Sequence, residues 1–412
     1  VGRVVVYQRG RVWYLRYHEQ GKRHQPRVGP NKQAARQLAA QVNAQLETGV
    51  PAATSYEPLS IAELQQRWLD HHEHVRRSSV ATVNRYRTAT AYLLRFVDEV
   101  QPLRHAGLLS PVHAEAFVRY LRGLRVSPNG HAHTPKRALR DKGLKFILEA
   151  CRALYGFAAR RRHLPPYTEN PFTVIEISRI PDETAKPITL LDDSHQQQML
   201  EQADAWFGPI LVTLMLTGLR PGELTHLLVE DIDLQAQVLY IRNKPALGWK
   251  TKTRNERMIP LMPAHLTMLQ RHLAGRTSGP LFLRQRFGPC DLPSLIHLTS
   301  GRLREELARR AVGVDLNDRT TQARIARTLW RDMGAIRPER LRVSFMRLTC
   351  AAGATGVTAP KSLRHAFATR LQDANVDPLI RNRLMGHAPA NGGGLGMTAT
   401  YTHCRPETVR RQ

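Results

Sequence analysis

The sequence contains few cysteines and none of the local patterns that mark a metal or nucleotide site. Its four cysteines, Cys151, Cys290, Cys350 and Cys404, form no CxxC or CxxH pair, which argues against a structural zinc site and a disulfide framework. The segment HEHVRR at 72–77 lacks the HExxH spacing of a zinc protease, and no GxxxxGK[ST] loop occurs. We therefore expect no metal, no cofactor and a reducing compartment.

Long hydrophobic runs are also missing. No stretch approaches the roughly 18 consecutive apolar residues of a membrane span. The opening segment, VGRVVVYQRGRVWYLRY, alternates in polarity and carries arginines throughout, which is unlike a secretory signal. We therefore expect a protein without a membrane segment, located in the cytoplasm.

Acidic residues are scarce relative to basic ones. Lys and Arg number 61 against 34 Asp and Glu, which gives a formal charge of +27 and a pI near 10.9. Such an excess favours a polyanionic partner, with DNA as the first candidate. A ribosomal or RNA-coating protein and a membrane-surface protein are the alternatives. The 412 residues, 42% of them apolar, suffice for two to four packed domains.

The N-terminal segment predicts a small sheet with one helix. Residues 4–28 alternate in polarity like short strands separated by glycine turns, and residues 32–47 are typical of a helix. On these grounds we expect three strands. Their aromatic residues are expected in the core, and they are Trp13, Tyr14 and Tyr17. The arginines of the other strand face are candidate DNA contacts, namely Arg11, Arg16 and Arg23.

A helical region follows a Pro/Ala/Ser linker at 50–58. Ser60 and Glu63 have the spacing of a capping box, so a helix is expected to begin there. Further helices are predicted at 79–100, 111–124 and 135–162, and a second, proline-bearing linker at about 171–188. Candidate DNA contacts in this basic region are Arg85, Lys136 and Lys142.

The second half begins with two helices, at 193–204 and 206–217, the latter nearly all apolar and hence buried. A β segment is expected over 237–260, with a turn near 246–248 and a cationic tip, followed by a helix at 261–275. Two basic helices are then predicted near 297–311 and 318–333.

Several polar residues in this half stand where an isolated charge needs a partner. Arg220, in TGLRPGEL, directly follows the buried helix, so its charge requires an anion. Glu223, three residues on, is one such partner, which would make an ordinary ion pair. Lys361 and Arg364 are three residues apart and therefore share a helix face.

The order of these motifs resembles the catalytic domain of the tyrosine recombinase (phage integrase) family. The matching segments are TGLRPGEL at 217–224, TKTRNERMIPL at 251–261, KSLRHAFATRL from 361, LMGH at 384–387 and TATYTH at 398–403. The resemblance implies a set of catalytic residues, namely Arg220, Lys252, Lys361, Arg364, His387 and Tyr401. It also implies that Glu223 braces Arg220. Lys250 and Arg254 are rivals of Lys252 and further candidate DNA contacts.

Each implied role has a chemical reason. Metal-free cleavage of a phosphodiester needs cations for the charge on the phosphate oxygens, and the planar fork of arginine bonds two oxygens at once. Tyr401, a phenol with an ordinary pKa near 10, attacks only if nearby cations stabilise the phenolate. Lys252 would protonate the leaving 5′-oxygen. The family usually has histidine where this chain has Lys361, which leaves open the group that accepts the tyrosine proton.

The resemblance implies a multi-domain fold, mainly α with small β-sheets. Its expected parts are an arm-type DNA-binding domain at 1–50, a helical core-binding domain at 59–170 and an α+β catalytic domain at 188–412, with an insertion at about 285–350.

The implied activity is site-specific recombination of double-stranded DNA through a 3′-phosphotyrosyl intermediate and a Holliday junction. Four protomers would act on two duplexes in a prokaryotic nucleoid, with directionality or DNA-bending factors as candidate partners. The alternatives are a type IB topoisomerase-like or telomere-resolving enzyme, a non-catalytic DNA-binding protein with this fold, and an RNA-binding protein.

Overall fold

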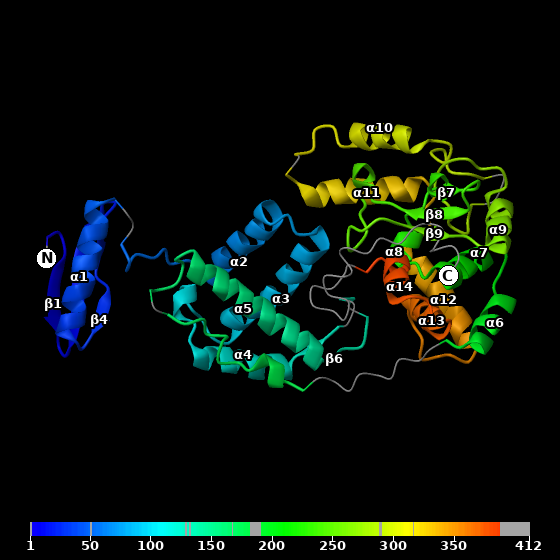
Figure 1. Ribbon diagram of the computed structural model, residues 1–412. Helices are drawn as coiled ribbons and strands as arrows, with labels where there is room; N and C mark the ends of the chain where they lie inside the picture. Colours follow the sequence, from blue (N-terminus) through cyan, green and yellow to red (C-terminus); the bar gives the residue numbers. More distant parts are fainter. Residues whose placement is uncertain are drawn as a thin grey trace. The chain divides into compact units, whose positions relative to one another are not determined.

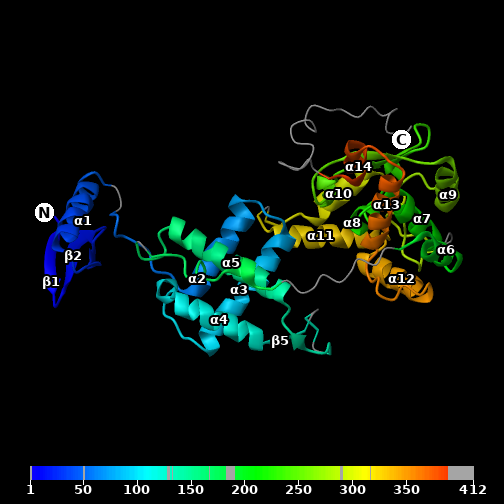
Figure 2. The same cartoon turned by 60° about the horizontal axis from the view of Figure 1, so that its bottom comes forward.

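The computed structural model describes residues 2–49, 52–127, 130–131, 133–166, 168–181, 191–287, 291–315 and 317–387. The chain divides into two compact units, Val1–Lys186 and Pro187–Gln412. Both are mainly helical, with small antiparallel sheets (Figures 1 and 2). This agrees with the predicted fold class.

The elements of the first unit are β1 (Val5–Arg9), β2 (Val12–Glu19), β3 (Lys22–His24), β4 (Arg27–Gly29), α1 (Lys32–Glu47), α2 (Ile61–Asp70), the π-helical turn η1 (His71–Val75), α3 (Val80–Glu99), η2 (Ala106–Leu108), α4 (Pro111–Gly123), β5 (Arg125–Val126), β6 (Arg137–Ala138), α5 (Asp141–Arg160) and η3 (Ile177–Arg179).

The elements of the second unit are α6 (Asp193–Glu201), α7 (Gly208–Thr217), α8 (Pro221–Leu224), η4 (Val229–Asp231), β7 (Ile232–Asp233), β8 (Val238–Ile241), η5 (Pro245–Leu247), β9 (Arg257–Pro260), α9 (Pro263–Leu273), α10 (Ser300–Arg310), α11 (Arg319–Asp332), α12 (Pro338–Ala351), α13 (Lys361–Asp373) and α14 (Pro378–Met385).

The N-terminal sheet has one strand more than predicted. Strand β2 pairs with β1 on one side and with both β3 and β4 on the other. The expected third strand is interrupted at Pro26, which has no N–H to donate to the ladder; its carbonyl still accepts from the amide of Leu15. One face of the sheet packs on α1 around Leu15 and Tyr17, while Arg16 is exposed.

The helical part of the first unit has a separate core, formed by α2, α3, α4 and α5. The predicted capping box is present, because Ser60 and Glu63 satisfy each other's backbone amides. The helix predicted at 135–162 was wrong at its start: residues 137–138 pair with 125–126 as β5 and β6, and α5 begins only at Asp141. Pairing with a distant strand overrides the local helix signal there.

The second unit is built around α7, a buried helix as predicted, whose apolar side chains are all buried or partly buried. The main core joins α7 to β8, β9, α9, α12, α13 and α14. Gly218 ends α7 in the left-handed region, with φ of +59°, and a Cβ there would lie 2.3 Å from the Phe367 ring. The glycine therefore lets α13 approach α7 closely. Strand order in the sheet is β7–β8–β9.

The basic helices predicted near 297–311 and 318–333 are present as α10 and α11, and they pack on the loop between β8 and β9. A second apolar cluster contains Leu247 of that loop together with Leu303, Leu329 and Trp330. The indole of Trp330 donates to the carbonyl of Leu247 at 3.0 Å. A Cβ on Gly248 would lie 2.3 Å from the Cβ of Ala326. Helices α10 and α11 thus pack closely on this loop. Figure 1 shows the two helices on the side of the β7–β8–β9 sheet.

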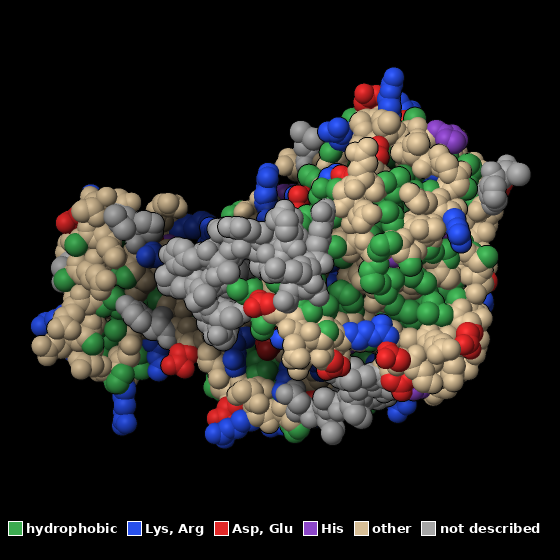
Figure 3. Space-filling model, turned by 45° about the vertical axis from the view of Figure 1, so that its right-hand side comes forward, with side chains coloured by type: hydrophobic (Ala, Val, Ile, Leu, Met, Phe, Trp, Pro, Cys, Tyr) green, Lys and Arg blue, Asp and Glu red, His purple; other side chains and the backbone are tan. Residues whose placement is uncertain are grey.

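The surface is uneven in character. In Figure 3, hydrophobic side chains gather on the right-hand part of the face in view, where Lys and Arg are few. No helix in the described part of the chain is long and apolar enough to span a membrane. Within the same residues, no group of three or more His, Cys, Asp or Glu is arranged to hold a metal ion.

Candidate active site

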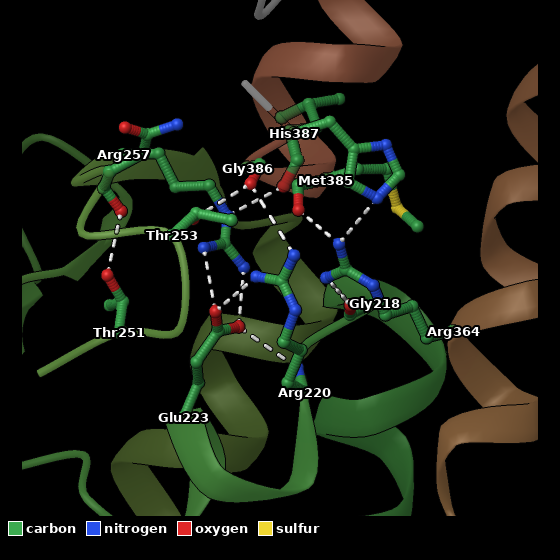
Figure 4. A network of polar contacts seen from close by, with 12 residues as sticks. Gly218, Arg220, Glu223, Thr251, Thr253, Arg257, Arg364, Met385, Gly386 and His387 are labelled. Atoms are coloured by element: carbon green, nitrogen blue, oxygen red, sulfur yellow. Dashed lines mark hydrogen bonds and ion pairs between the residues drawn. The ribbon is translucent and has the colours of Figure 1, made fainter. Parts of the chain in front are cut away.

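The ends of two helices meet in the second unit and present free carbonyls to arginine side chains (Figure 4). Helix α7 ends at Gly218 and α14 ends at Gly386, both left-handed glycine caps with φ of +59° and +60°. The last carbonyls of a helix lack intrahelical partners, and the helix dipole makes this end negative. Both ends therefore attract cations.

Arg364 lies between these two ends. Its guanidinium donates to the carbonyl of Gly218 at 2.7 Å, to the carbonyl of Met385 and, at 3.3 Å, to Nε2 of His387. The residue is only 3% exposed. Burial, together with the charge of Arg220, lowers its pKa to about 10, so it stays charged at neutral pH.

Glu223 is the shared anion of the site. It braces Arg220, as the resemblance implied, through Oε1 to the guanidinium at 2.8 Å and Oε2 to the backbone amide at 3.0 Å. Burial acts to raise the pKa of Glu223, but hydrogen bonds from Arg257 and Arg220 outweigh it and hold this pKa below its ordinary value.

Arg257 is a member of the site that the sequence analysis missed. Its guanidinium bonds both carboxylate oxygens of Glu223, at 3.2 and 2.7 Å, and its Nε donates to the carbonyl of Leu384 at 2.7 Å. The side chain is 2% exposed. The available signal was strand alternation: Arg257 stands two residues before the buried Ile259 in β9 and so faces the same side.

Gly386 and His387 close the site from the α14 side. The carbonyl of Gly386 accepts from the hydroxyl of Thr253 at 3.2 Å and from Arg220 at 3.5 Å. A Cβ on Gly386 would lie 2.8 Å from Nη1 of Arg257. Burial and then the charge of Arg364 lower the pKa of His387, which favours the neutral ring that can accept from Arg364.

Lys361 is exposed at the first position of α13, one turn before Arg364. Its charge contributes to the lowered pKa of both His365 and His387, which places it within electrostatic reach of the cluster. No hydrogen bond or ion pair of its ammonium group occurs among the described residues.

Lys252 is exposed in the loop between β8 and β9, between two anchored residues. Thr251 donates to Oδ1 of Asn243 from both its amide and its hydroxyl, at 2.9 and 3.0 Å. Thr253 reaches Gly386, as described above. The loop backbone is therefore tied to the arginine cluster, while the ammonium of Lys252 stays at the surface.

Tyr401, the predicted nucleophile, lies outside the described residues. The other predicted DNA contacts are all at the surface: Arg11, Arg16, Arg23, Arg85, Lys136, Lys142, Lys250 and Arg254. Arg85 lies over the ring of Phe146, 3.7 Å from its centre. Their roles stay predictions.

The cluster carries more positive charge than it neutralises. Arg220 and Arg257 share the carboxylate of Glu223. Arg364 is bonded instead to backbone carbonyls and His387. Three cations and one anion leave a formal charge of +2 in a largely buried site. A buried charge is costly unless an opposite charge meets it. The arrangement therefore has the charge and the donors that suit a compact anion, and paired guanidinium groups fit the oxygens of a phosphate.

Comparison with known proteins names the class. The phage integrase family model matches residues 189–408, which is more than half of the chain, so the chain belongs to the phage integrase family. It is a tyrosine-type site-specific recombinase. It is 23% identical to tyrosine recombinase XerC of Chlamydia trachomatis, over 82% of this chain and 91% of that one. It is 27% identical to tyrosine recombinase XerA of Pyrococcus furiosus, over 49% and 53%.

Solved structures share the fold. A lambda integrase tetramer bound to a Holliday junction matches with a TM-score of 0.52 and 15% identity, covering 94% of this chain and 96% of that one. The Tn1549 transposon integrase in complex with transposon right-end DNA matches with a TM-score of 0.50 and 17% identity, over 86% and 98%.

Proposed function

We propose that Tyr401 cleaves DNA by attacking a backbone phosphate that Arg220 and Arg364 hold. The observation that carries this proposal is the surplus of charge around Arg364, because Glu223 is engaged by Arg220 and Arg257. A phosphate entering beside Arg364 would supply the missing anion. The guanidinium groups are already fixed by helix-end carbonyls, so they would need little reorganisation as charge develops on the phosphate oxygens.

In the proposed step the phenol oxygen of Tyr401 forms a bond to phosphorus while the bond to the 5′-oxygen breaks. Tyr401 loses its proton to solvent or to the group at position 361, and the 5′-oxygen gains a proton from Lys252, which takes one up again from solvent. The product is a 3′-phosphotyrosyl link and a free 5′-hydroxyl. Attack by an equivalent hydroxyl of a partner strand reverses the step. Because one phosphodiester is exchanged for another, neither a nucleotide nor a metal is required.

The assembly we propose is four protomers on two duplexes, with a Holliday junction between two rounds of exchange. The lambda integrase that shares the fold forms such a tetramer on a Holliday junction. The N-terminal sheet and the α2–α5 bundle have separate cores, and we assign them arm-site and core-site binding of DNA in a prokaryotic nucleoid.

The test is a nicked suicide duplex from the ends of the element, incubated with the protein in EDTA. We expect an SDS-resistant protein–DNA adduct that is lost in Tyr401→Phe and kept in Tyr240→Phe, a matched tyrosine of β8 in the same unit. If wild-type protein binds a confirmed cognate site but forms no adduct, the chain is a non-catalytic DNA-binding protein and the proposal is refuted.

A further inference from the structure

Arginines gather in a hollow of the second unit that the proposed reaction does not use. The hollow, of about 500 Å³, lies between the segment after Leu283 and one face of α12. Its lining is mostly cationic, with Trp206 at one side, and the arginines are Arg284, Arg286, Arg337, Arg340 and Arg347. A second hollow of about 560 Å³ shares three of these and adds Arg331.

Carboxylates do not balance this charge. The second hollow also contains two aspartates, Asp291 and Asp332. Asp332 is already engaged by Arg310 at 2.7 Å and by Arg331 at 3.0 Å, and Asp291 is exposed. Among the residues that the structure describes, the five arginines of the first hollow have no Asp or Glu within ion-pair distance. The hollow therefore has a positive electrostatic potential that attracts anions.

Two arginines of the hollow are held in place by their neighbours, and one of them is partly desolvated. Arg284 donates to the carbonyl of Arg331, and its Nε is buried with no partner among the described residues. Arg284 and Arg286 both lie over the ring of Phe287, 5.0 and 4.6 Å from its centre. Burial, and then the charges of Arg286 and Arg337, lower the pKa of Arg284. A bound anion would reduce the electrostatic repulsion between arginines that are held this close together.

The geometry favours an extended anion over a compact one. Arg337, Arg340 and Arg347 are spaced by three and seven residues, so they follow one face of α12. With a rise of about 1.5 Å per residue, this stripe is about 15 Å long. A single phosphate meets one or two arginines, whereas duplex DNA offers about one negative charge per 1.7 Å of its axis.

The hollow is separate from the candidate active site. Trp206 precedes α7 and is fixed by a hydrogen bond from its indole to the carbonyl of Leu283, at 2.8 Å. Arg220 follows the other end of the same helix. The ten residues of α7 separate the two by about 15 Å at 1.5 Å per residue. One phosphate cannot contact both.

We propose that this arginine hollow binds the phosphate backbone of a DNA segment other than the one held for cleavage. The inference rests on the proposed function only in taking DNA as the polymer that this chain meets. Its own last residues, THCRPETVRRQ, are a poor occupant because they carry three arginines against one glutamate. The arginine stripe is repelled by such a segment.

The test uses the full chain and a random-sequence duplex, with affinity measured by fluorescence anisotropy across salt concentrations. The variant is Arg337→Gln/Arg340→Gln/Arg347→Gln, three exposed side chains. If each contacts a phosphate, the slope of log K against log salt becomes shallower by about 2.7, at about 0.9 per contact. The control is Arg302→Gln/Arg304→Gln/Arg309→Gln on α10, which removes the same charge from exposed positions.

An equal change of slope in both variants means a general charge effect and overturns the proposal, as does an unchanged slope in the α12 variant. Binding of polyglutamate that the α12 variant alone loses, with an unaltered DNA slope, assigns the hollow to an acidic protein and also overturns it. Adduct formation on a short cognate duplex is measured in parallel. If wild-type protein forms no adduct, the cleavage proposal is refuted. The comparison of salt slopes still tests whether the hollow binds DNA.

Discussion

Replacing Arg257 by methionine removes a buried cation while keeping a side chain of similar length. In the folded protein this guanidinium bonds both oxygens of Glu223 and the carbonyl of Leu384. It thereby ties β9 to α8, the short helix that bears Glu223, and to the end of α14, beside His387. Its loss should affect both the stability of the second unit and the geometry of the site.

The expected loss of stability in Arg257→Met depends on the hydrogen-bond partners that remain. Removing one member of a buried ion pair costs about 3–5 kcal/mol when it leaves an uncompensated charge. Glu223 keeps two bonds from Arg220, at 2.8 and 3.0 Å, so the lower end, about 3 kcal/mol, applies. The carbonyl of Leu384 loses its donor, which adds about 1 kcal/mol. A total near 4 kcal/mol is a large part of the 5–15 kcal/mol of a typical domain.

Amide hydrogen exchange of peptides from β9 and α14 measures this change where it is expected. Cleavage is followed by the rate of adduct formation well below the unfolding temperature. Arg257→Lys keeps the charge but not the two-pronged contact, so an intermediate loss is expected. The control is Arg302→Met on α10, where the pair with Glu305 is exposed and separated by 3.4 Å. Little change is expected there.

The reasoning is refuted if the free energy of opening of α14 in Arg257→Met lies within about 1 kcal/mol of the wild-type value. That threshold equals the smallest cost given above, the loss of one hydrogen bond. A double-mutant cycle with Glu223→Gln gives a second check. The two changes should be strongly non-additive, because each removes the same contact. Additive effects would mean that the pair contributes nothing as a pair.

Three further changes test other parts of the structure. Gly248→Ala forces a side chain against Ala326 at positive φ; thermal unfolding should show a loss of about 1–3 kcal/mol, and slower adduct formation would follow from displacement of the loop that bears Lys252. Burial lowers the pKa of His265 to about 4. As the pH falls below about 6.5, this histidine is therefore protonated in the unfolded chain before it is protonated in the folded one. The free energy of unfolding should drop by about 3 kcal/mol between there and about pH 4. In urea titrations at pH 7 and pH 4.5, His265→Gln should lose less stability than wild type; an equal loss contradicts the assignment. Lys361→His should retain adduct formation and add a step near pH 6.5 to the pH–rate profile; an unchanged profile would mean that this position takes no proton.

Local signals in the sequence predicted the elements that local interactions determine. The capping box at Ser60 and Glu63 gave the start of α2, and the apolar run before Gly218 gave a buried α7. The start of α5 was misplaced because the residues before it pair with a strand more than ten residues earlier. Such pairing depends on tertiary context, which single-sequence patterns do not contain.

The residues of the candidate site likewise include some that the sequence predicted and some that it did not. Arg220, Glu223 and Arg364 stand in compact motifs, and the structure places them together around the ends of α7 and α14. Arg257 lies in the matching segment TKTRNERMIPL, but the sequence analysis assigned no role to it, and its place in the strand alternation was the signal of an inward-facing side chain. The packing of α11 on the loop that bears Lys252 had no sequence signal, because it depends on contacts between residues about eighty positions apart.

The two helix ends explain why three arginines can be buried around one glutamate. Glycine caps leave the last carbonyls of α7 and α14 unpaired, and the arginines satisfy those of Gly218, Leu384, Met385 and Gly386. Carbonyl dipoles compensate part of each charge but carry no net charge themselves, so the formal surplus remains. A fully neutralised cluster would bind phosphate weakly, and an unsupported one would not stay folded. For the proposed phosphate binding, the glycines at 218 and 386 are therefore as necessary as the arginines, although neither would touch the phosphate with a side chain.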